Sequence, residues 1–592
     1  MEELVYKIVS SKKNQRKVGF IVLFLLLFAV AMIPTKLVLA KMLPGKSANT
    51  FSIYIDTATN STVAQTKEVA ECVVDVMRNE ENVQNMELFI GQGAPLDYAG
   101  LVKGSAFKSR KNQAEIVVNL TDKHERKEPS YMMVHRLRPI VKNRCENIYK
   151  YTRIKFIEMP SGPPTYATIV VNLFGKDMLL LRRISKRVAA ALKETEGLVD
   201  VDVLQDNIFT KFEIYPDVEK IISSDLSVEQ VSSILYMAFK GNIVATKNST
   251  QQQDQIPIFV SLNKETRLLD HASKADLELK LSRLKLLNRK GAMVPVREVV
   301  TIIPTVADPT IYKKNMRYMV SVTAECDLVS QVYPLMEARE KMIAKLSKDF
   351  DIKRLTGMST YMFDLELRDK ESGEKVLLRW DGEMKVSLDT FRDLGGAFIA
   401  ALVLMFLLMV VYYKSFALSG IVLVGSFLSI IGVIIGHYFT DKIALYLTDV
   451  HFYLTATSLI GFISLMGISA RSSLLLIDFT KSLIASGVEK HRAIAIATAT
   501  RAKPILLTAV AIILGSLLLA TDPIFGGLGI ALIFGSIAST LVSLFYIPVL
   551  MAKTAAICPV DKEQACEEGL GSDGRDLDIE AITPEIHEEQ KL

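Results

Sequence analysis

The sequence predicts an α-helical membrane protein with six transmembrane helices, arranged as one plus five, and a large α+β domain between the first helix and the second. The chain has 592 residues, of which 50% are hydrophobic, and its mean hydropathy of +0.27 is too high for a soluble protein. Charged residues still make up 23% of the chain, so the apolar residues must be segregated into separate segments. The sequence therefore predicts membrane spans joined to a sizeable domain outside the membrane.

Six apolar runs are long enough to cross a bilayer as helices. They lie at 18–39, 391–412, 417–437, 455–478, 504–521 and 527–552. The first run follows a basic segment, 1–17, as the core of a signal peptide does. However, it is too long for a signal core, and the residues after Lys41 lack a small-x-small cleavage site. We therefore predict a retained helix over 18–40, with Lys36 reaching the outer edge of the bilayer.

Basic residues in the short loops predict the orientation of the helices. The segment 12–17, Lys414 and the stretch 481–503 all fall on one side of the membrane, which the positive-inside rule makes cytoplasmic. The loops 438–453 and 522–526 fall on the other side. An even number of spans then places both termini in the cytoplasm and the large domain outside it.

The large domain begins with a repeating pattern of strands and helices. Strand-like alternation and helical periodicity follow each other in the order β-α-β-β-α-β, the ferredoxin-like pattern. The expected strands are 51–55, 86–90, 114–120 and 153–157, and the expected helices are 61–78 and 131–148. We predict that residues 41–160 form the first subdomain.

A second copy of the pattern follows the hinge Pro160–Pro164 and is interrupted by an insert. Its expected elements are the strands 166–173, 199–204, 316–323 and 360–367 and the helices 178–196 and 329–348. The second subdomain is thus predicted over 161–205 and 313–380, and the insert over 206–312. Within the insert, Ser227 and Gln230 form a capping box that predicts a helix over 227–240.

The residues after the second subdomain lead back to the membrane. An amphipathic segment, 380–394, is expected to lie along the outer surface, and the region 381–553 holds helices two to six. The acidic segment 554–592 is predicted to be a disordered cytoplasmic tail, because it is rich in Gly, Asp and Glu and its last thirty residues or so have no aromatic side chain.

Five cysteines are present, and none of their spacings matches a zinc finger. They are Cys72, Cys145, Cys326, Cys558 and Cys566. Since an odd number is poor support for a disulfide framework, we expect buried free thiols.

Several functional classes are excluded by what the chain lacks. The net charge of +5 is small and spread out, which does not favour nucleic-acid binding. The tripeptide Gly45-Lys46-Ser47 is not a phosphate-binding loop, because Ala40 stands where that motif needs glycine. No serine, cysteine or histidine constellation resembles a nucleophile set, so the chain is not expected to be an enzyme.

One ionisable residue stands out in the predicted spans. Arg471 lies well inside the run 455–478, where a charge is costly and marks a functional site by default. Ser472 follows it, and Asp478 lies about two turns further along the same face. A structural ion pair with Asp478, or snorkelling to the boundary, would be a non-functional explanation of the arginine.

The neighbouring span supplies two more polar residues. Arg501 precedes Thr508 by about two turns, which puts both on one face. Together with Arg471 they predict a polar track between two helices, a proton relay, with Ser472 and Asp478 in support. A proton-driven cycle also needs a carboxylate that titrates within the membrane, and the predicted spans contain no Asp or Glu deep in the bilayer. The acid must then come from outside this chain.

These residues resemble the C-terminal half of a resistance–nodulation–division (RND) transporter. The matching segments are 391–398, 461–479, 501–515 and 521–529. The resemblance implies that Arg471, Arg501 and Thr508 are relay positions, with Ser472 where the family usually has asparagine. It also implies that a separate N-terminal-half chain supplies paired aspartates at the place that 469–473 occupies here.

The resemblance further implies an assembly and a location. The two subdomains would be porter subdomains, and the insert would be a docking or funnel subdomain. The partners would be the N-terminal-half chain, a periplasmic adaptor and an outer-membrane channel, in a trimeric assembly in the bacterial inner membrane. The energy source would be the proton-motive force, with no cofactor.

The substrate is the least determined part of this prediction. Metal-exporting relatives carry methionines at positions that match Ile55, Gln113 and Met159, and only the last is methionine here. We therefore expect export of drugs or other organic compounds. The alternatives are a heavy-metal efflux subunit, a non-transporting scaffold, and a homo-oligomeric lipid or protein exporter, although the last should carry an acid in the Arg471 span.

Overall fold

The computed structural model describes residues 1–159, 162, 165–267, 273–355, 363–448 and 450–558. The chain divides into two compact units, one formed by the residues up to Leu204 and from Tyr312 onward, and the other by Gln205–Ile311. Most of the predicted Pro160–Pro164 hinge, and the predicted tail from residue 559 with Cys566, lie outside the described residues.

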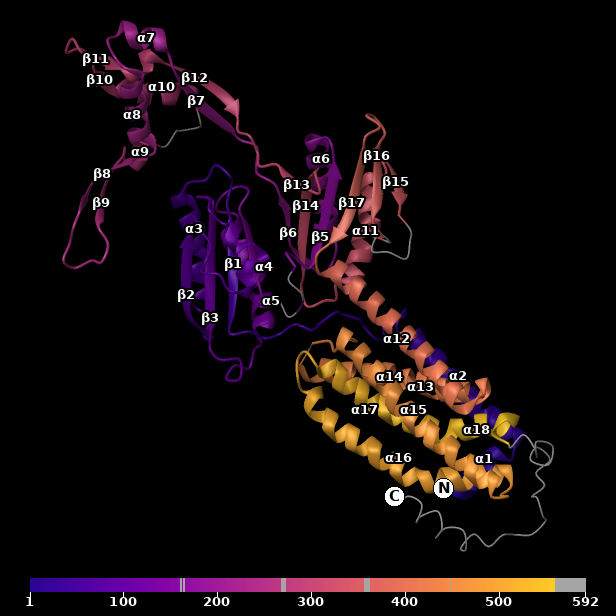
Figure 1. Cartoon of the computed structure of the whole chain (residues 1–592). Helices are drawn as coiled ribbons and strands as arrows, with labels where there is room; N and C mark the ends of the chain where they lie inside the picture. The colour runs from indigo at the N-terminus through magenta and orange to yellow at the C-terminus, as the bar shows by residue number, and fades with distance from the viewer. Residues whose placement is uncertain (160–161, 163–164, 268–272, 356–362, 449, 559–592) are drawn as a thin grey trace. The chain divides into compact units, whose positions relative to one another are not determined.

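Six helical segments of the first unit are long and apolar enough to cross a membrane, in the part of the chain that the structure describes. They are α2 (Lys12–Ala31), α12 (Glu383–Tyr413), α13 with α14 (Phe416–Phe427 and Ile430–Thr448), α15 (Ala456–Ala485), α16 (Lys490–Ala520), and α17 with α18 (Gly526–Leu541 and Ile547–Lys553). A short helix, α1 (Glu2–Val9), precedes them, and a π-helical turn, Val542–Tyr546, joins the last two pieces. Together with the sheet-containing domain, they confirm the predicted fold class (Figure 1).

Three of these helices begin well before the predicted spans. The first, α2, starts at Lys12 instead of residue 18 and ends at Ala31 instead of residue 39. α16 starts at Lys490 and continues through Pro504, where the prediction had placed its first residue. Proline is tolerated inside membrane helices because neighbouring helices and side chains satisfy the freed backbone groups. α12 starts at Glu383 and is continuous to Tyr413, so the predicted surface segment 380–394 is the first part of a membrane helix instead.

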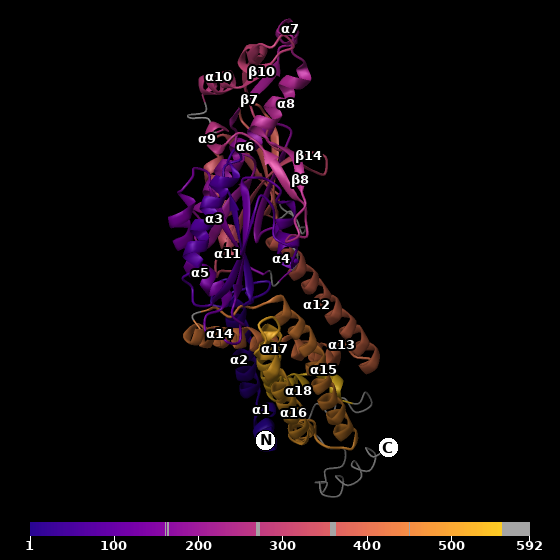
Figure 2. The same cartoon turned by 90° about the vertical axis from the view of Figure 1, so that its left-hand side faces the viewer.

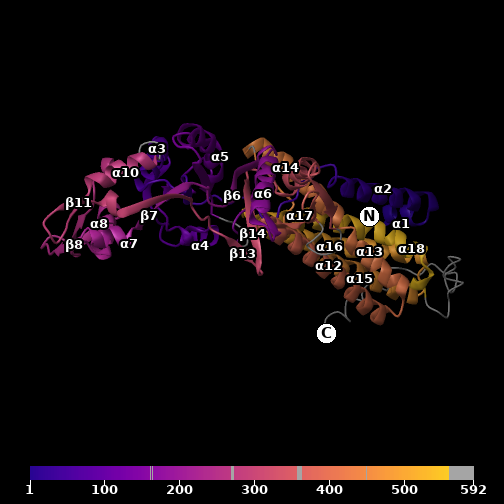
Figure 3. The ribbon, with the colours of Figure 1, turned by 90° about the horizontal axis from the view of Figure 1, so that it is seen from above.

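Small residues bring the helices of the bundle close together. α17 packs against α14, α15 and α16 (Figure 3). A Cβ atom on Gly432 of α14 would lie 2.2 Å from the carbonyl oxygen of Phe534, and one on Gly535 would lie 2.1 Å from Leu465. Such close backbone approach is typical of membrane helix interfaces, where packing replaces the hydrophobic effect.

The first subdomain is a four-stranded antiparallel sheet in the order β2-β3-β1-β4. Its elements are β1 (Thr50–Asp56), α3 (Val63–Met77), β2 (Val83–Ile90), α4 (Tyr98–Lys103), η1 (Ser105–Phe107), β3 (Gln113–Leu120), α5 (Ser130–Val141), η2 (Lys142–Glu146) and β4 (Arg153–Ile157). On β1, Phe51, Ile53 and Ile55 point into a core shared with α3 and α5. Tyr54 and Asp56 alternate with them and therefore belong to the opposite, polar face.

A disulfide joins Cys72 on α3 to Cys145 on η2. The expectation of free thiols was wrong for this pair. The two residues are 73 positions apart, and only the packing of both helices on one face of the sheet brings them together. Cys326 is a free cysteine.

The second subdomain is a seven-stranded sheet in the order β13-β14-β5-β17-β16-β15, with β6 also paired to β14. Its elements are β5 (Ile169–Gly175), α6 (Met178–Lys193), β6 (Leu198–Leu204), β13 (Tyr312–Lys314), β14 (Arg317–Cys326), α11 (Val332–Leu346), β15 (Phe350–Arg354), β16 (Leu365–Asp369) and β17 (Lys375–Asp381). β17, a strand that the sequence analysis did not predict, pairs with β5 on the side away from β14, and the described end of the predicted strand 360–367 lies in β16. β16 pairs on the far side of β17, because the chain returns through a hairpin before it enters α12.

The other compact unit, Gln205–Ile311, has a core of its own. Its elements are β7 (Thr210–Pro216), α7 (Val218–Ser223), α8 (Val228–Phe239), β8 (Asn242–Lys247), β9 (Ile256–Val260), α9 (Lys264–Arg267), α10 (Lys274–Arg283), β10 (Lys285–Leu287), β11 (Met293–Pro295), η4 (Val296–Val299) and β12 (Val300–Val306). β7 pairs with β12, and Ile221, Val231 and Leu281 are fully buried between the helices. Ser227 and Gln230 form the predicted capping box at the start of α8.

The segment after α2 is bonded to the start of α15. The backbone N–H of Lys41 donates to Leu454 (3.0 Å), and the N–H of Leu454 donates to Leu39 (2.8 Å). Before this segment the chain turns at Lys36, whose ammonium lies 5.2 Å from the centre of the Tyr333 ring. Lys36 therefore contacts the second subdomain, which the predicted snorkelling did not anticipate. α2 itself packs against α14 (Figure 2).

Candidate functional site

Arg471 lies in the middle of α15 and is exposed on the surface of this chain. Among the described residues, no carboxylate lies within 4.0 Å of its guanidinium. Its neighbour Ser472 donates to the carbonyl of Ile468 (3.3 Å), one turn back on the same helix. Arg471 is therefore a charge in the apolar zone whose counter-ion the described chain does not supply.

Asp478 has a different partner. The hydroxyl of Tyr412 on α12 donates to its Oδ2 (3.2 Å), and the hydroxyl of the next residue, Tyr413, donates to the carbonyl of Leu474 (3.2 Å). Seven residues along an α-helix correspond to about 10 Å, so Asp478 and Arg471 are too far apart for direct contact. The structure thus joins Asp478 to α12 and does not form the ion pair with Arg471.

Arg501 and Thr508 lie on α16, which packs against α15. The Arg501 guanidinium lies 5.0 Å from the centre of the Phe479 ring of α15, and its buried Nε has no hydrogen-bond partner among the described residues. Thr508 is exposed, and its hydroxyl donates to the carbonyl of Pro504 (2.8 Å) on its own helix. The structure brings Arg501 next to α15, but within the described residues no hydrogen bond connects Arg471, Arg501 and Thr508 to one another.

Two buried ionisable residues of α14 were missed by the sequence analysis. His437 is fully buried, with Nδ1 2.8 Å from the carbonyl oxygen of Val433 and Nε2 2.8 Å from Oγ of Ser458. Asp441, one turn further, accepts from the backbone N–H of Phe452 (2.8 Å) and from His451 (3.0 Å). The predicted span ended at residue 437, whereas the helix continues to Thr448. The signal in the sequence would have been a histidine and an aspartate four residues apart, at the end of an apolar run.

Asp441 does not replace the acid that Arg471 lacks. It lies in the C-terminal half of α14 and is bonded to the loop that leads into α15. Arg471 lies 15 residues after Ala456, which is about 22 Å along α15. Among the described residues, therefore, no carboxylate lies close to Arg471.

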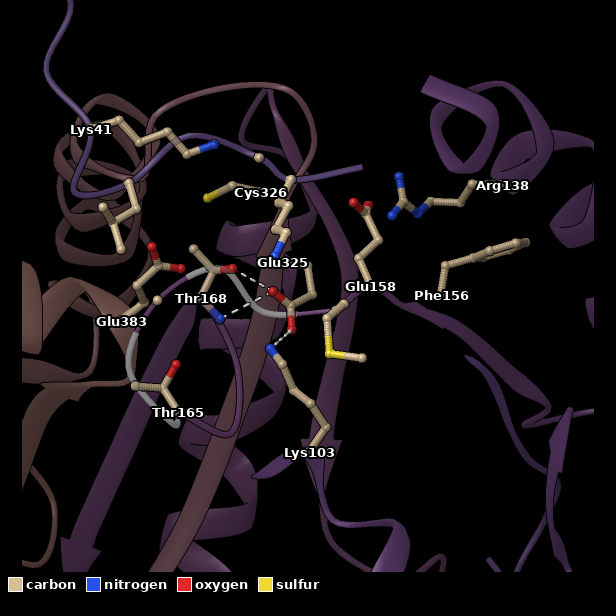
Figure 4. A pocket seen from close by; sticks show the side chains of 15 residues that line it. Lys41, Lys103, Arg138, Phe156, Glu158, Thr165, Thr168, Glu325, Cys326 and Glu383 are labelled. Atoms are coloured by element: carbon tan, nitrogen blue, oxygen red, sulfur yellow. Dashed lines mark hydrogen bonds and ion pairs between the residues drawn. The ribbon is translucent and has the colours of Figure 1, made fainter. Parts of the chain in front are cut away.

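A charged pocket lies outside the bundle, between the two subdomains and the segments that leave α2 and enter α12. Its charged lining residues are Lys41, Lys46, Lys103, Arg138, Glu158, Glu325 and Glu383. Glu325 is the best satisfied of them: Lys103 donates to Oε1 (2.8 Å), and the N–H of Thr168 donates to Oε2 (3.1 Å) (Figure 4). Burial opposes its charge, but these donors prevail and keep the pKa of Glu325 below its usual range.

A second carboxylate of the pocket, Glu158, has a raised pKa. Burial raises the pKa of Glu158, although the nearby Arg138 partly offsets the effect. This group therefore takes up a proton more readily than an exposed glutamate would.

The pocket does not hold a set of soft metal ligands. Cys326 and Met159 line it, and burial raises the pKa of the Cys326 thiol, which disfavours the thiolate that a metal needs. Of the other positions compared with metal exporters, Ile55 is in the apolar core and Gln113 faces Asp56. In the described part of the chain no group of three or more His, Cys, Asp or Glu side chains is placed to bind a metal.

Comparison with known proteins gives consistent matches over most of the chain. The model of the AcrB/AcrD/AcrF family matches residues 2–362 and 366–555. The swarming motility protein SwrC of Bacillus subtilis is 22% identical over 538 residues, which cover 90% of this chain and 45% of that protein. The multidrug export protein AcrF of Escherichia coli is 22% identical over 523 residues (86% and 45%), and the nickel and cobalt resistance protein CnrA of Cupriavidus metallidurans is 24% identical over 429 residues (71% and 36%).

The crystal structure of a heavy metal efflux pump has the same fold, with a TM-score of 0.68 and 16% identity. The match covers 93% of this chain and 51% of that one. The chain thus spans less than half the length of the three curated relatives and about half the length of the solved pump.

Proposed function

The chain belongs to the AcrB/AcrD/AcrF family, in agreement with its resemblance to RND transporters, and on this premise we propose that it is one subunit of a proton-driven efflux pump. A second chain, equivalent to an N-terminal half, would supply the aspartates of the relay. The observation that carries this proposal is Arg471. It is a charge exposed in the middle of a membrane helix, and no carboxylate of the described chain neutralises it.

In this function Arg471 provides the fixed positive charge and the partner provides the acids. An arginine stays protonated under all physiological conditions, so the partner carboxylates are the groups that titrate. Their protonation weakens the pairing with Arg471, and α15 and α16 shift, with Arg501 moving against Phe479. The shift drives the porter subdomains through alternating access.

The location of the large domain is supported by its disulfide. Disulfides form and persist in oxidising compartments, such as the bacterial periplasm. Cys72 and Cys145 lie in the domain that the positive-inside rule puts outside the cytoplasm. We propose that the pump resides in the inner membrane and works as a trimer with a periplasmic adaptor and an outer-membrane channel, to which the Gln205–Ile311 unit docks.

The proposed cargo is a drug or another organic compound, with metal ions as the second candidate. The names of CnrA and of the solved pump favour metal export, while the name of AcrF favours drugs. Only Met159 among the three compared positions offers a soft ligand, which argues against a soft metal. Growth of cells that express the pump, measured in the presence of cobalt, nickel or organic dyes, distinguishes export of metal ions from export of organic compounds.

The relay is tested by replacing Arg471 in cells that express this chain together with its partner. Arg471→Ala should reduce proton-coupled efflux by at least about 100-fold while the protein level stays normal, because partner acids would lose their fixed counter-ion. Lys503→Ala is the matched control, since Lys503 is an exposed cation of the neighbouring helix α16 and is not one of the proposed relay residues.

Two results would contradict the proposal. Efflux by the Arg471→Ala variant at the wild-type rate would show that Arg471 has no role in a proton relay. Efflux by this chain without any second chain would show that the missing acids are not needed. A scaffold, the non-transporting alternative, would show no efflux in any combination.

A further inference from the structure

The two subdomains have separate apolar cores. The core of the first is built from β1, β3, β4, α3 and α5, and the core of the second from β5, β14, β16, β17, α6 and α11. No residue belongs to both clusters. The contact between the subdomains must therefore depend on other interactions, and those within the described residues are largely ionic.

Two aspartates of β6 make the central contacts. Asp200 is bonded to Arg138 (3.3 Å) and Lys142 (2.7 Å) and also accepts from the backbone N–H of Phe156 (3.1 Å). The side chain of Asp200 is 1% exposed and that of Arg138 is 6% exposed. This ion pair is therefore shielded from water to the same extent as side chains in the interior of a domain.

The second aspartate of β6 repeats the arrangement two residues later. Asp202 is bonded to Arg153 (2.5 Å) and Lys155 (2.5 Å), both on β4 of the first subdomain. Because residues two apart in a strand point to the same face, Asp200 and Asp202 both face the first subdomain.

Two carboxylates from the end of β14 and just beyond it complete the contact. Glu325 is bonded to Lys103 (2.8 Å). Asp327 is bonded to Arg138 (2.7 Å) and His135 (2.7 Å).

Every ion pair that crosses between the subdomains in the described residues has the same polarity. The second subdomain contributes the carboxylates Asp200, Asp202, Glu325 and Asp327, and the first contributes the cations Lys103, Arg138, Lys142, Arg153 and Lys155 together with the imidazole of His135. We call these ten residues the ionic seam. Each side alone would be a surface of crowded like charges. The charges of each side are neutralised mainly by the other side, although Asp56 of the first subdomain also lies 3.4 Å from Lys155.

Such a contact is suited to repeated opening. For buried ion pairs the Coulomb attraction and the loss of hydration nearly cancel, so the closed state and a water-filled open state have similar free energies. An apolar contact of the same size would resist separation, because water cannot replace its interactions. Polar contacts within a chain are accordingly the ones at which subdomains move.

We propose that the ionic seam is a reversible latch that holds the two subdomains closed, next to the charged pocket described above. The opening of the latch is a property of the large domain alone. Its use for cargo passage rests on the proposed transport function. Once open, the cleft would present a basic wall opposite an acidic wall, so it would admit water and charged or strongly polar groups.

The latch is tested by measuring the distance between the subdomains in the full chain. Spin labels are placed on Cys residues at two exposed positions, Glu87 on β2 and Lys353 on β15. The unaltered seam should give one main distance. Asp200→Asn with Asp202→Asn should remove the carboxylates that pair with Lys142 and Arg153, while Arg138 and Lys155 keep only Asp327 and Asp56. The ratio of open to closed molecules should then increase about tenfold or more.

Reversing one pair distinguishes a latch from a general loss of structure. Lys103 and Glu325 form an ion pair with each other, so Glu325→Lys alone should open the cleft. Glu325→Lys combined with Lys103→Glu should restore the closed distance. Arg136→Ala is the matched control. It removes ion pairs with Glu80 and Glu128 inside the first subdomain and should leave the distance unchanged.

An unchanged distance in the double-asparagine variant, or a failure of the reversed pair to restore the closed state, would overturn the latch. Equal opening in the Arg136 variant would also overturn it. Since the measurement does not involve transport, a failure of the latch is distinguishable from a failure of the pump proposal, which the Arg471 experiment tests separately.

Discussion

A single buried lysine gives the large domain a dependence on alkaline pH. Lys108 donates to the carbonyl of Ala114 (2.9 Å), and its ammonium lies 3.6 Å from the centre of the Tyr54 ring. Burial lowers its pKa from 10.5 to about 8, and the carboxylates of Asp56 and Glu115 only partly offset this effect. Between these two pH values the unfolded chain holds a proton that the folded chain has released, so a rise in pH favours the folded state.

We therefore predict that Lys108→Met changes the pH dependence of stability. The wild-type chain should gain a stabilising contribution between about pH 8 and pH 10.5 that the variant lacks. The thermal unfolding midpoint of both proteins in detergent, measured at pH 8 and pH 10, checks this expectation. Identical changes in the two proteins would contradict it.

At the scale of residues, the sequence alone locates Arg471 in an apolar run but does not show which side chains lie around it. A charge in an apolar run is visible without any structure, since its cost depends only on the bilayer. The partner of Asp478 was not visible, because Tyr412 lies 66 positions away. Asp441 was missed because the predicted run ended at residue 437, about three turns before the end of α14, and His437, the last residue of that run, was not singled out. The pairing of Cys72 with Cys145 required the tertiary fold.

Contacts between helices in the bundle depend on glycines at defined positions. Gly432→Ala would place a methyl group 2.2 Å from the backbone oxygen of Phe534 and 2.6 Å from Ala538, and a helix backbone cannot move aside easily. We predict a loss of about 1–3 kcal/mol of stability, the usual effect of overpacking. Gly515→Ala is the control, because nothing lies within 4 Å of the added atom.

The unfolding midpoint of the detergent-solubilised chain is the measurement for both glycine variants. Gly432→Ala should lower it and Gly515→Ala should leave it unchanged or raise it slightly, as alanine favours a helix more than glycine does. Equal midpoints in the two variants would show that α14 and α17 do not pack as described.

At the scale of elements, the hydrophobic pattern of the sequence predicted well which helices exist and predicted poorly where they begin and end. The apolar runs identified all six spans, but helices α12 and α16 extend beyond them into polar sequence, where hydropathy carries no signal. The apolar run of α16 begins at Pro504, whereas the helix continues through this proline, which membrane helices tolerate inside. The strand β17, which pairs with β5, was not predicted, and strand order was not predictable because pairing leaves no local trace in the sequence.

The orientation of the whole molecule gives a further prediction. If the large domain lies outside the cytoplasm, a cysteine at Lys348, which is exposed after α11, should react with a membrane-impermeant thiol reagent in cells with a permeable outer membrane. A cysteine at Ser486, exposed between α15 and α16, should react only after the inner membrane is opened. The reverse pattern of labelling would invert the topology.

The packing of the first two helices has a consequence for how the protein is made. α2 rests against α14, and α1 rests against α16 and α18, so the earliest helices contact some of the latest. Roughly 400 residues separate the end of α2 at residue 31 from the start of α14 at residue 430, which at about 5–20 residues per second takes about 20–80 seconds to translate. During that time the first span lacks its native neighbours while the large domain is synthesised. Its insertion therefore depends on lipid, or on a helper that shelters it, until the other five spans are synthesised.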